Sequence, residues 1–100
     1  RGTLGTTWIK EHAKMDDHVH VAHNVTVGRA AKITACAEVS GSVTVGDGAW
    51  IGPNAAILDG IVLGEKAFIG IGAVIRKDCA PKGVYAGNPA RLLRMSTTEE

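Results

Sequence analysis

Aliphatic side chains recur at every sixth position along most of this chain. The series has no gap and runs through Ile9, Met15, Val21, Val27, Ile33, Val39, Val45, Ile51, Ile57, Leu63, Ile69 and Ile75. This period fits neither an amphipathic α-helix, which repeats every ~3.6 residues, nor a strand with one buried face, which repeats every second residue. It is typical of a parallel β-helix built from hexapeptide units. The pattern therefore predicts an all-β fold for residues 1–80.

The other positions of the repeat indicate how each hexapeptide turns. If the aliphatic residue is the first position, the fifth is mostly small and the second is often glycine. The fourth position favours residues that tolerate a positive φ angle. These residues are Asn24, Gly48, Asn54, Gly60 and Gly72. Each unit is therefore a short strand followed by a sharp turn, with the first and fifth side chains inward and the sixth outward.

Three such units make one triangular coil, so residues 18 apart in sequence stack about 4.8 Å apart along the axis. We expect a triangular prism of about four to five coils over residues 1–80, in which residues 3–8 belong to a further coil. Residues 81–100, where the repeat has faded, are expected to form a short irregular turn and tail.

Composition narrows the possible partners and the compartment. The formal net charge is only +1, which gives no electrostatic case for binding nucleic acid or a membrane surface. No apolar run is long enough for membrane insertion, and no signal peptide is visible. Cys36 and Cys79 form neither a disulfide framework nor a metal-binding pair. Two free thiols favour the reducing cytoplasm as the location.

Four histidines lie within twelve residues near the start of the chain. His12 and His18 occupy fourth positions on turns, and His20 occupies an outward sixth position, so a solvated or interfacial role is the simplest interpretation of these three. His23 occupies a third position, which the repeat places on a corner of the prism. Histidine is the side chain best suited to proton transfer near neutral pH, so His23 is the candidate general base.

The column above His23 supplies further candidate residues. Gly41 lies one coil further, where the missing side chain leaves a backbone N–H uncovered about 5 Å from the histidine corner. A base beside a bare amide donor can activate an attacking amine or hydroxyl and hold the oxyanion of a thioester. The column continues through Asp59 to Lys77, about 14 Å from His23. A pantetheine arm could lie along it, with its phosphates near Lys77, and Lys82, Arg91 and Arg94 add positive charge at the same end.

The stretch 15–28, MDDHVHVAHNVTVG, resembles the catalytic segment of the UDP-3-O-acylglucosamine N-acyltransferases of lipid A biosynthesis, and the resemblance extends over residues 1–80. It implies a left-handed β-helix and a homotrimer with the active site between subunits. It also implies that His23 is the general base and that Gly41 supplies the oxyanion amide. Asp16 matches an aspartate of the same family that supports the site.

The segment 83–91, GVYAGNPAR, resembles instead the ending of acetyl-CoA-dependent sugar acetyltransferases with hexapeptide repeats. In those enzymes this segment folds back near the coenzyme, which implies coenzyme contacts for Gly87, Asn88 and Arg91. The two resemblances together imply an acyltransferase that uses acetyl-CoA or another acyl thioester, carried by CoA or by acyl carrier protein. The implied acceptor is an amine or hydroxyl of a sugar or nucleotide sugar.

Two alternatives remain open at this point. His18 and His23 have the spacing found in γ-class carbonic anhydrases, but a catalytic zinc needs three protein ligands and the third would precede Arg1. We therefore expect no metal. The second alternative is a trimeric β-helix without catalysis. Trp50 and Phe68, on one outer wall, are expected to be buried against a partner or to shield that wall.

Overall fold

The computed structural model describes residues 7–96, which form fourteen strands and no helix. The first twelve strands contain two residues each, at the sixth and first positions of successive hexapeptides. They are β1 Trp8–Ile9, β2 Lys14–Met15, β3 His20–Val21, β4 Thr26–Val27, β5 Lys32–Ile33, β6 Glu38–Val39, β7 Thr44–Val45, β8 Trp50–Ile51, β9 Ala56–Ile57, β10 Val62–Leu63, β11 Phe68–Ile69 and β12 Val74–Ile75. Two longer strands follow, β13 Gly83–Gly87 and β14 Ala90–Met95.

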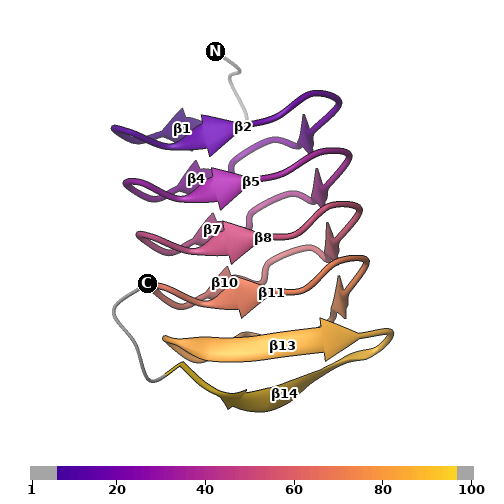
Figure 1. Cartoon of the computed structure of the whole chain (residues 1–100). Coiled ribbons are helices and arrows are strands. Elements are labelled where there is room, and N and C mark those ends of the chain that lie inside the picture. The colour runs from indigo at the N-terminus through magenta and orange to yellow at the C-terminus, as the bar shows by residue number, and fades with distance from the viewer. Residues whose placement is uncertain (1–6, 97–100) are drawn as a thin grey trace.

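The strands stack into three flat walls, which form a prism of triangular cross-section (Figure 1). Wall A has the order β1-β4-β7-β10, wall C has the order β12-β9-β6-β3, and wall B has the order β14-β13-β11-β8-β5-β2. Pairing between successive coils is parallel and joins residues 18 apart, as in the pair of Trp8 with Thr26. The predicted coil length and the three predicted ladders are confirmed by this register.

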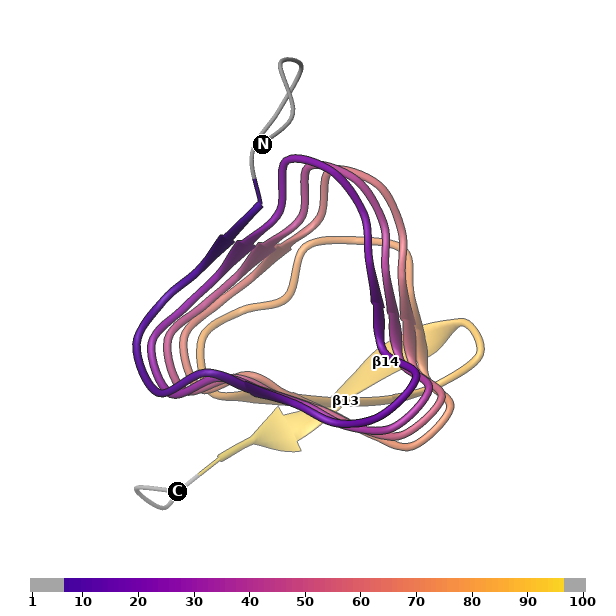
Figure 2. The same cartoon turned by 90° about the horizontal axis from the view of Figure 1, so that it is seen from above.

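The prism is left-handed, as the resemblance implied. Figure 2 views the molecule along its axis with the N-terminal coils in front, and the chain runs anticlockwise as it recedes from the viewer.

Within residues 7–96 no helix is long and apolar enough to cross a lipid bilayer.

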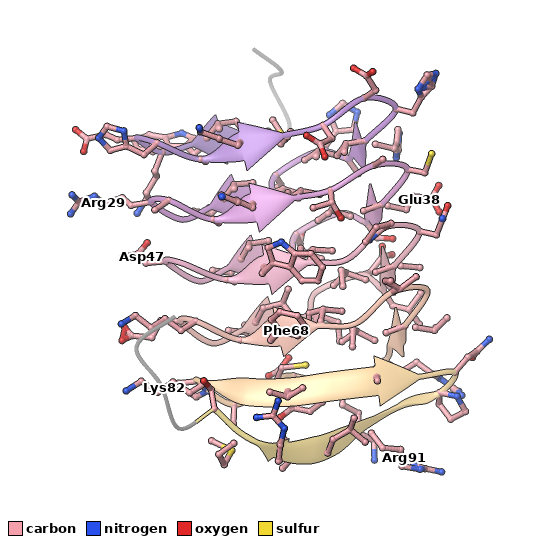
Figure 3. All side chains as sticks on the ribbon, in the orientation of Figure 1. Arg29, Glu38, Asp47, Phe68, Lys82 and Arg91 are labelled. Atoms are coloured by element: carbon pink, nitrogen blue, oxygen red, sulfur yellow. The ribbon has the colours of Figure 1, made fainter. Side chains whose placement is uncertain are left out.

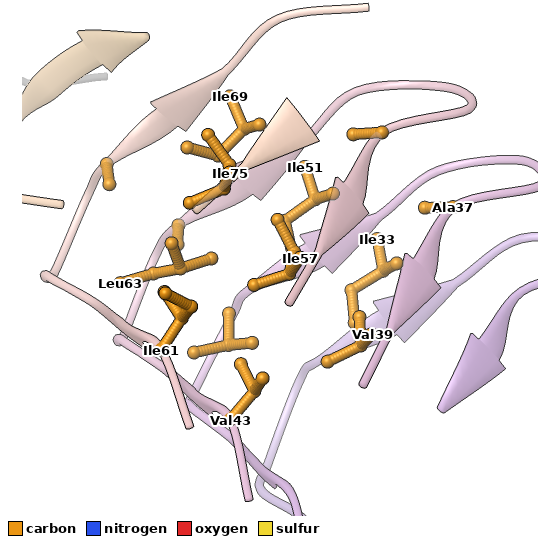
Figure 4. Packing of buried hydrophobic residues seen from close by; sticks show 14 of the residues in the cluster. Ile33, Ala37, Val39, Val43, Ile51, Ile57, Ile61, Leu63, Ile69 and Ile75 are labelled. Carbon is orange, nitrogen blue, oxygen red and sulfur yellow. The ribbon is translucent and has the colours of Figure 1, made fainter. Parts of the chain in front are cut away.

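The narrow interior is filled by the predicted inward positions (Figure 4). From the second coil onwards the aliphatic ladder of wall B is buried, with exposed fractions of 1% for Ile33 and 0% for Ile51 and Ile69. Small fifth-position residues such as Ala37 and Ala55 leave room for these larger side chains, so the interior packs closely. At the N-terminal end the ladder is open, and Ile9 and Met15 are exposed.

The sharp turns at the corners depend on a positive φ at the fourth position, and the stacking of coils depends on glycine at the second position. Residues at the fourth position adopt a positive φ, including the non-glycine residues Asn24, Cys36 and Lys66 at 62°, 62° and 58°. The second-position glycine serves a different purpose. A Cβ on Gly46 would lie 2.6 Å from the backbone nitrogen of Glu65 on the next coil. A bare Cα at this position therefore lets successive coils stack at their normal spacing.

The last coil is two residues shorter than the others. Leu63 pairs with Cys79, which is 16 residues away instead of 18. The backbone N–H of Val62 donates to the Asp78 carboxylate over 2.8 Å, where earlier coils offer a backbone carbonyl. The side chain of Asp78 thus replaces a missing peptide group, and the last coil cuts inside the outline of the others (Figure 2).

The C-terminal segment is a β-hairpin, and the expected irregular tail was wrong for residues 83–95. β13 continues wall B in register, with Val84 beside Phe68 and Tyr85 beside Ile69. The chain then reverses at a cis Asn88–Pro89 bond, and β14 pairs antiparallel with β13. Wall B offers β13 a free strand edge, and this edge supplies the backbone partners that the turn-rich sequence did not reveal.

Candidate active site

Three corners join the walls, and each carries a column of turn residues. The AB corner joins walls A and B at residues 11–12, 29–30, 47–48 and 65–66; the BC corner contains residues 17–18, 35–36, 53–54 and 71–72; the CA corner contains residues 23–24, 41–42 and 59–60. On each corner a backbone N–H of one coil donates to a carbonyl of the preceding coil, and these bonds fix the stacking.

The structure places His23 and Gly41 on the CA corner, one coil apart, as the sequence predicts. The Ser42 N–H donates to the His23 carbonyl over 3.1 Å. The Asn24 side-chain amide donates to the Ser42 hydroxyl over 3.2 Å, so the two turns are joined through both backbone and side-chain atoms. His23 is exposed and can therefore contact a substrate outside the prism.

Gly41 offers an uncovered amide at this corner. Within residues 7–96 its N–H has no hydrogen-bond acceptor, while its carbonyl accepts from the Gly60 N–H over 2.9 Å. Free third-position amides occur on other corners as well, but Gly41 is the only glycine among the third positions from Glu11 to Lys77. What distinguishes the CA corner is therefore the absence of a side chain beside a histidine one coil away.

Asp16 lies elsewhere in the same protomer. It follows β2 at the end of wall B, where its N–H donates to the Ile33 carbonyl over 2.9 Å, and its side chain is exposed. Strand β3 of wall C separates this position from His23. One protomer therefore does not bring Asp16 and His23 to a single corner.

A cleft of about 600 Å³ opens at the C-terminal end of the CA corner, where the last coil is shortened. It is lined by Ile75, Arg76, Lys77, Asp78, Cys79, Tyr85, Pro89, Ala90, Arg91 and Leu92. The cleft brings together Lys77 and Arg91, two of the predicted coenzyme contacts. Lys77 does not continue the 18-residue spacing of the His23 column, because the chain departs from that spacing after Ile75.

Arg76 lies in the cleft and was missed from the sequence. Its position follows Ala22, Ser40 and Leu58 in the second-position column of the same corner, so the repeat could have located it. Three cations, Arg76, Lys77 and Arg91, against the single carboxylate of Asp78, suit the cleft to an anionic ligand.

The remaining predicted coenzyme residues lie around the hairpin. The Lys82 N–H donates to the Glu65 carbonyl on the AB corner, away from the cleft lining. Figure 3 shows Lys82 and Arg91 at opposite ends of the hairpin. Gly87 ends β13 and Asn88 begins the hairpin turn, next to Pro89 in the cleft wall. The structure therefore groups Gly87 and Asn88 with Arg91 and separates Lys82 from them.

The other histidines do not join His23. His12 lies on the AB corner, His18 lies on the BC corner, and His20 on wall C stands beside Glu38 in the β3–β6 pair. His18 and His23, the pair considered for zinc, thus occupy different corners. Among residues 7–96 no group of three His, Cys, Asp or Glu side chains is arranged to hold a metal ion.

Cys79 is the one thiol in the cleft lining. Burial, with a smaller effect from the negative charge of Asp78, raises the pKa of Cys79 to about 11. Its thiol is therefore protonated at neutral pH, and a protonated thiol is a poor nucleophile. The cleft can hold a ligand through its cations, but it offers no thiolate for a covalent intermediate.

Residues 42–79 match the family described as bacterial transferase hexapeptide with six repeats. The UDP-3-O-acylglucosamine N-acyltransferase of Desulfosudis oleivorans is 54% identical over 35 residues, which are 35% of this chain and 10% of that protein. The chain thus spans a small part of this relative.

Solved structures extend the similarity to most of the coil. LpxA from Acinetobacter baumannii superposes with a TM-score of 0.82 and 27% identity, over 84% of this chain and 33% of that one. A serine acetyltransferase in complex with CoA superposes with a TM-score of 0.79 and 25% identity, over 87% of this chain and 39% of that one. Residues 42–79 thus match the hexapeptide-repeat model, and most of the coil shares its fold with these solved structures.

Proposed function

We propose that this protein is an acyl-CoA-dependent acyltransferase that transfers an acetyl group to an amine or hydroxyl of a sugar or nucleotide sugar. One observation carries the proposal: exposed His23 and the bare Gly41 N–H lie one coil apart on a corner that ends in a cationic cleft. The names of the related proteins, which are N-acyltransferases and acetyltransferases, support the reaction class.

The mechanism is direct transfer between two bound substrates. The acceptor nucleophile attacks the thioester carbonyl carbon while the His23 imidazole removes its proton. The carbonyl oxygen becomes an oxyanion that accepts a hydrogen bond from the Gly41 N–H. Collapse of the tetrahedral intermediate breaks the C–S bond, and the departing CoA sulfur takes a proton from the imidazolium. The acyl product and free CoA then dissociate, and His23 has returned to its neutral form.

The donor is proposed to lie along the CA corner. Its phosphates would bind in the cleft, where Arg76, Lys77 and Arg91 supply positive charge. Its pantetheine arm would pass Asp59 and bring the thioester to Gly41 and His23, about three coil spacings or 14 Å from the cleft. The CoA bound to the similar serine acetyltransferase supports this choice of donor.

The assembly is proposed to be a homotrimer with the active site between subunits. Asp16 and His23 stand at opposite ends of wall C in one protomer, and both are exposed in the same coil. A threefold axis parallel to the prism keeps equivalent coils at equal height. A neighbour's BC corner placed against the CA corner would therefore bring its Asp16 beside His23 without an axial shift.

Replacement of the base tests the proposal. The His23→Ala variant should lower kcat by about 100-fold or more, because positioned general bases contribute factors of this order. Turnover is measured as CoA release from acetyl-CoA with a panel of amino sugars and nucleotide amino sugars. His20→Ala is the matched control, since His20 is exposed on wall C but lies off the corner.

Two outcomes would count against this assignment. If wild-type protein releases no CoA with any acceptor of this class, the proposed reaction loses its support. If wild-type protein is active but His23→Ala loses less than about tenfold, His23 is not the base.

A further inference from the structure

Strand β14 ends wall B and presents a free edge. It contains six residues, whereas the twelve strands of the coils contain two each. It is the last strand in the order of wall B, and its outer edge faces out of the C-terminal end of the prism (Figure 1). Within residues 7–96 no strand pairs with this edge. A row of backbone N–H and C=O groups is thus available to another chain.

The side chains of β14 combine exposed apolar groups with unpaired cations. Leu92, Leu93 and Met95 are 49%, 63% and 46% exposed, respectively. Arg91 and Arg94 are also exposed, and neither forms an ion pair with any residue of the described part of the chain. This edge therefore offers apolar area and positive charge together with its backbone groups.

Two possible occupants fit this edge poorly. A lipid surface cannot supply hydrogen bonds to the backbone groups of a strand edge, so burying the edge in hydrocarbon would leave them unsatisfied. A second copy of the chain, paired antiparallel over the whole strand, would set Arg91 of one copy against Arg94 of the other. Like charges directly opposite each other destabilise a strand pair.

The register within the hairpin defines what would fit better. Arg94 lies beside Val84 and Arg91 lies beside Ala86, while the irregularity between Val84 and Tyr85 leaves Leu93 without a partner on β13. Val84 and Ala86 are two residues apart, so both arginines lie on the outer face of wall B. A regular strand on the other edge would likewise match the two arginines with residues two apart on one face.

We propose that the free edge of β14 is a docking site for an extended segment of a partner protein in which acidic and apolar residues alternate. Two carboxylates two positions apart face Arg91 and Arg94, and the intervening apolar residues cover the face that carries Leu92. The backbone of the segment pairs with β14 and adds a seventh strand to wall B.

A synthetic peptide tests this proposal on the full chain. The probe is a capped eight-residue peptide that alternates glutamate and valine, labelled for fluorescence anisotropy. We expect a Kd on the order of 100 µM or tighter at low salt, because the edge combines backbone pairing with two unpaired cations. Binding should weaken as salt is raised, since exposed charges are screened.

Matched controls separate strand pairing from simple charge attraction. A peptide of the same composition with its glutamates grouped at one end should bind at least about tenfold more weakly, as should the alternating peptide to Arg94→Glu protein. The Lys32→Glu variant makes the same charge change on wall B, four strands away on β5, and should bind like wild type. N-methylation of alternate peptide amides should abolish binding, because it removes the donors that pair with β14.

Four results would overturn the proposal: no binding by the alternating peptide, equal binding by the grouped peptide, equal binding by the N-methylated peptide, or dimers of the wild-type chain that exclude the alternating peptide. The last result would assign the edge to a second copy. Arg91 also lines the cleft, so a docked segment would compete with the CoA phosphates for it. Arg94 lies outside the cleft lining and the CA corner, so CoA release by Arg94→Glu protein reports separately on the proposed acyl transfer.

Discussion

At the residue scale, the two cysteines show how position in the repeat sets chemical behaviour. Cys36 occupies a fourth position on the BC corner and is exposed, whereas Cys79 points into the interior and is 5% exposed. The Cys79 thiol approaches the Lys77 carbonyl at 3.7 Å. Burial and the charge of Asp78 both favour its protonated form, and its pKa rises to about 11.

Thiol labelling should separate the two cysteines. At pH 8 one equivalent of an aromatic disulfide reagent should react rapidly with Cys36, and Cys79 should react only on unfolding, because a thiol that is buried and protonated attacks slowly. The Cys36→Ser variant checks the assignment, since it should lose the fast phase alone. Rapid labelling of that variant in the folded state would show that Cys79 is accessible.

The same pKa shift fixes the sign of a pH dependence. The pKa of Cys79 rises from 9.0 to about 11 on folding, so folding favours the protonated thiol. This contribution to stability is fully present below pH 9 and is lost as the pH rises towards about 11. The free energy of unfolding from denaturant titrations should therefore fall over this interval more steeply for wild type than for Cys79→Ala.

At the element scale, the hexapeptide assigns different tasks to its glycines. Gly46, at a second position, lies against the backbone of the next coil, and an added Cβ would sit 2.6 Å from the Glu65 nitrogen. Gly41, at a third position, has space, and the nearest atom to an added Cβ is the His23 carbonyl oxygen at 3.6 Å. The first glycine therefore holds coils together, and the second leaves an amide uncovered.

Adding one methyl group at each glycine should affect a different property, stability at Gly46 and turnover at Gly41. Gly46→Ala should lower the free energy of unfolding by about 2 kcal/mol, because backbone must move to admit the Cβ. Gly41→Ala should unfold like wild type, since 3.6 Å is an ordinary van der Waals separation, yet lower kcat by about tenfold by crowding the oxyanion amide. Denaturant titration and CoA release measure the two effects. Wild-type turnover by Gly41→Ala would argue against an oxyanion role for this amide.

The repeat also explains what sequence could and could not predict at this scale. A strict period fixes which residues face inward and which stand one coil apart, so the shared corner of His23 and Gly41 follows from the sequence alone. The last coil depends on the Asp78 carboxylate, which accepts a hydrogen bond in place of a backbone carbonyl. A periodic sequence pattern does not predict such a replacement. The cleft and the hairpin follow from that shortened coil, so the sequence did not reveal them, although the repeat could have located Arg76 in the cleft lining.

At the scale of the whole molecule, the prism separates groups that the proposed chemistry would use together. Asp16 and His23 lie in one coil but at opposite ends of wall C, and the rigid stack offers no hinge between them. Packed interiors of this kind transmit shape and resist local rearrangement. If Asp16 supports catalysis, it must act on the His23 of a neighbouring copy, and full catalytic activity then requires the oligomer.

Mixing two inactive variants tests this arrangement directly. Asp16→Asn and His23→Ala chains, each with its own affinity tag, are co-expressed in equal amounts, and doubly tagged oligomers are purified alongside either variant alone. Each shared site needs His23 from an Asp16→Asn chain and Asp16 from the next, His23→Ala, chain. A trimer that contains both chains has one intact site of three, so the doubly tagged oligomers should regain about one third of wild-type turnover.

A site contained in one chain gives a different result. Every such site in the mixture carries one of the two substitutions, so turnover would equal the average of the two variants and would not rise on mixing. Solution mass adds an independent criterion, because a monomer cannot share a site. The measured ratio of mixed to parental activity therefore distinguishes a catalytic unit of one prism from one built where the corners of two prisms meet.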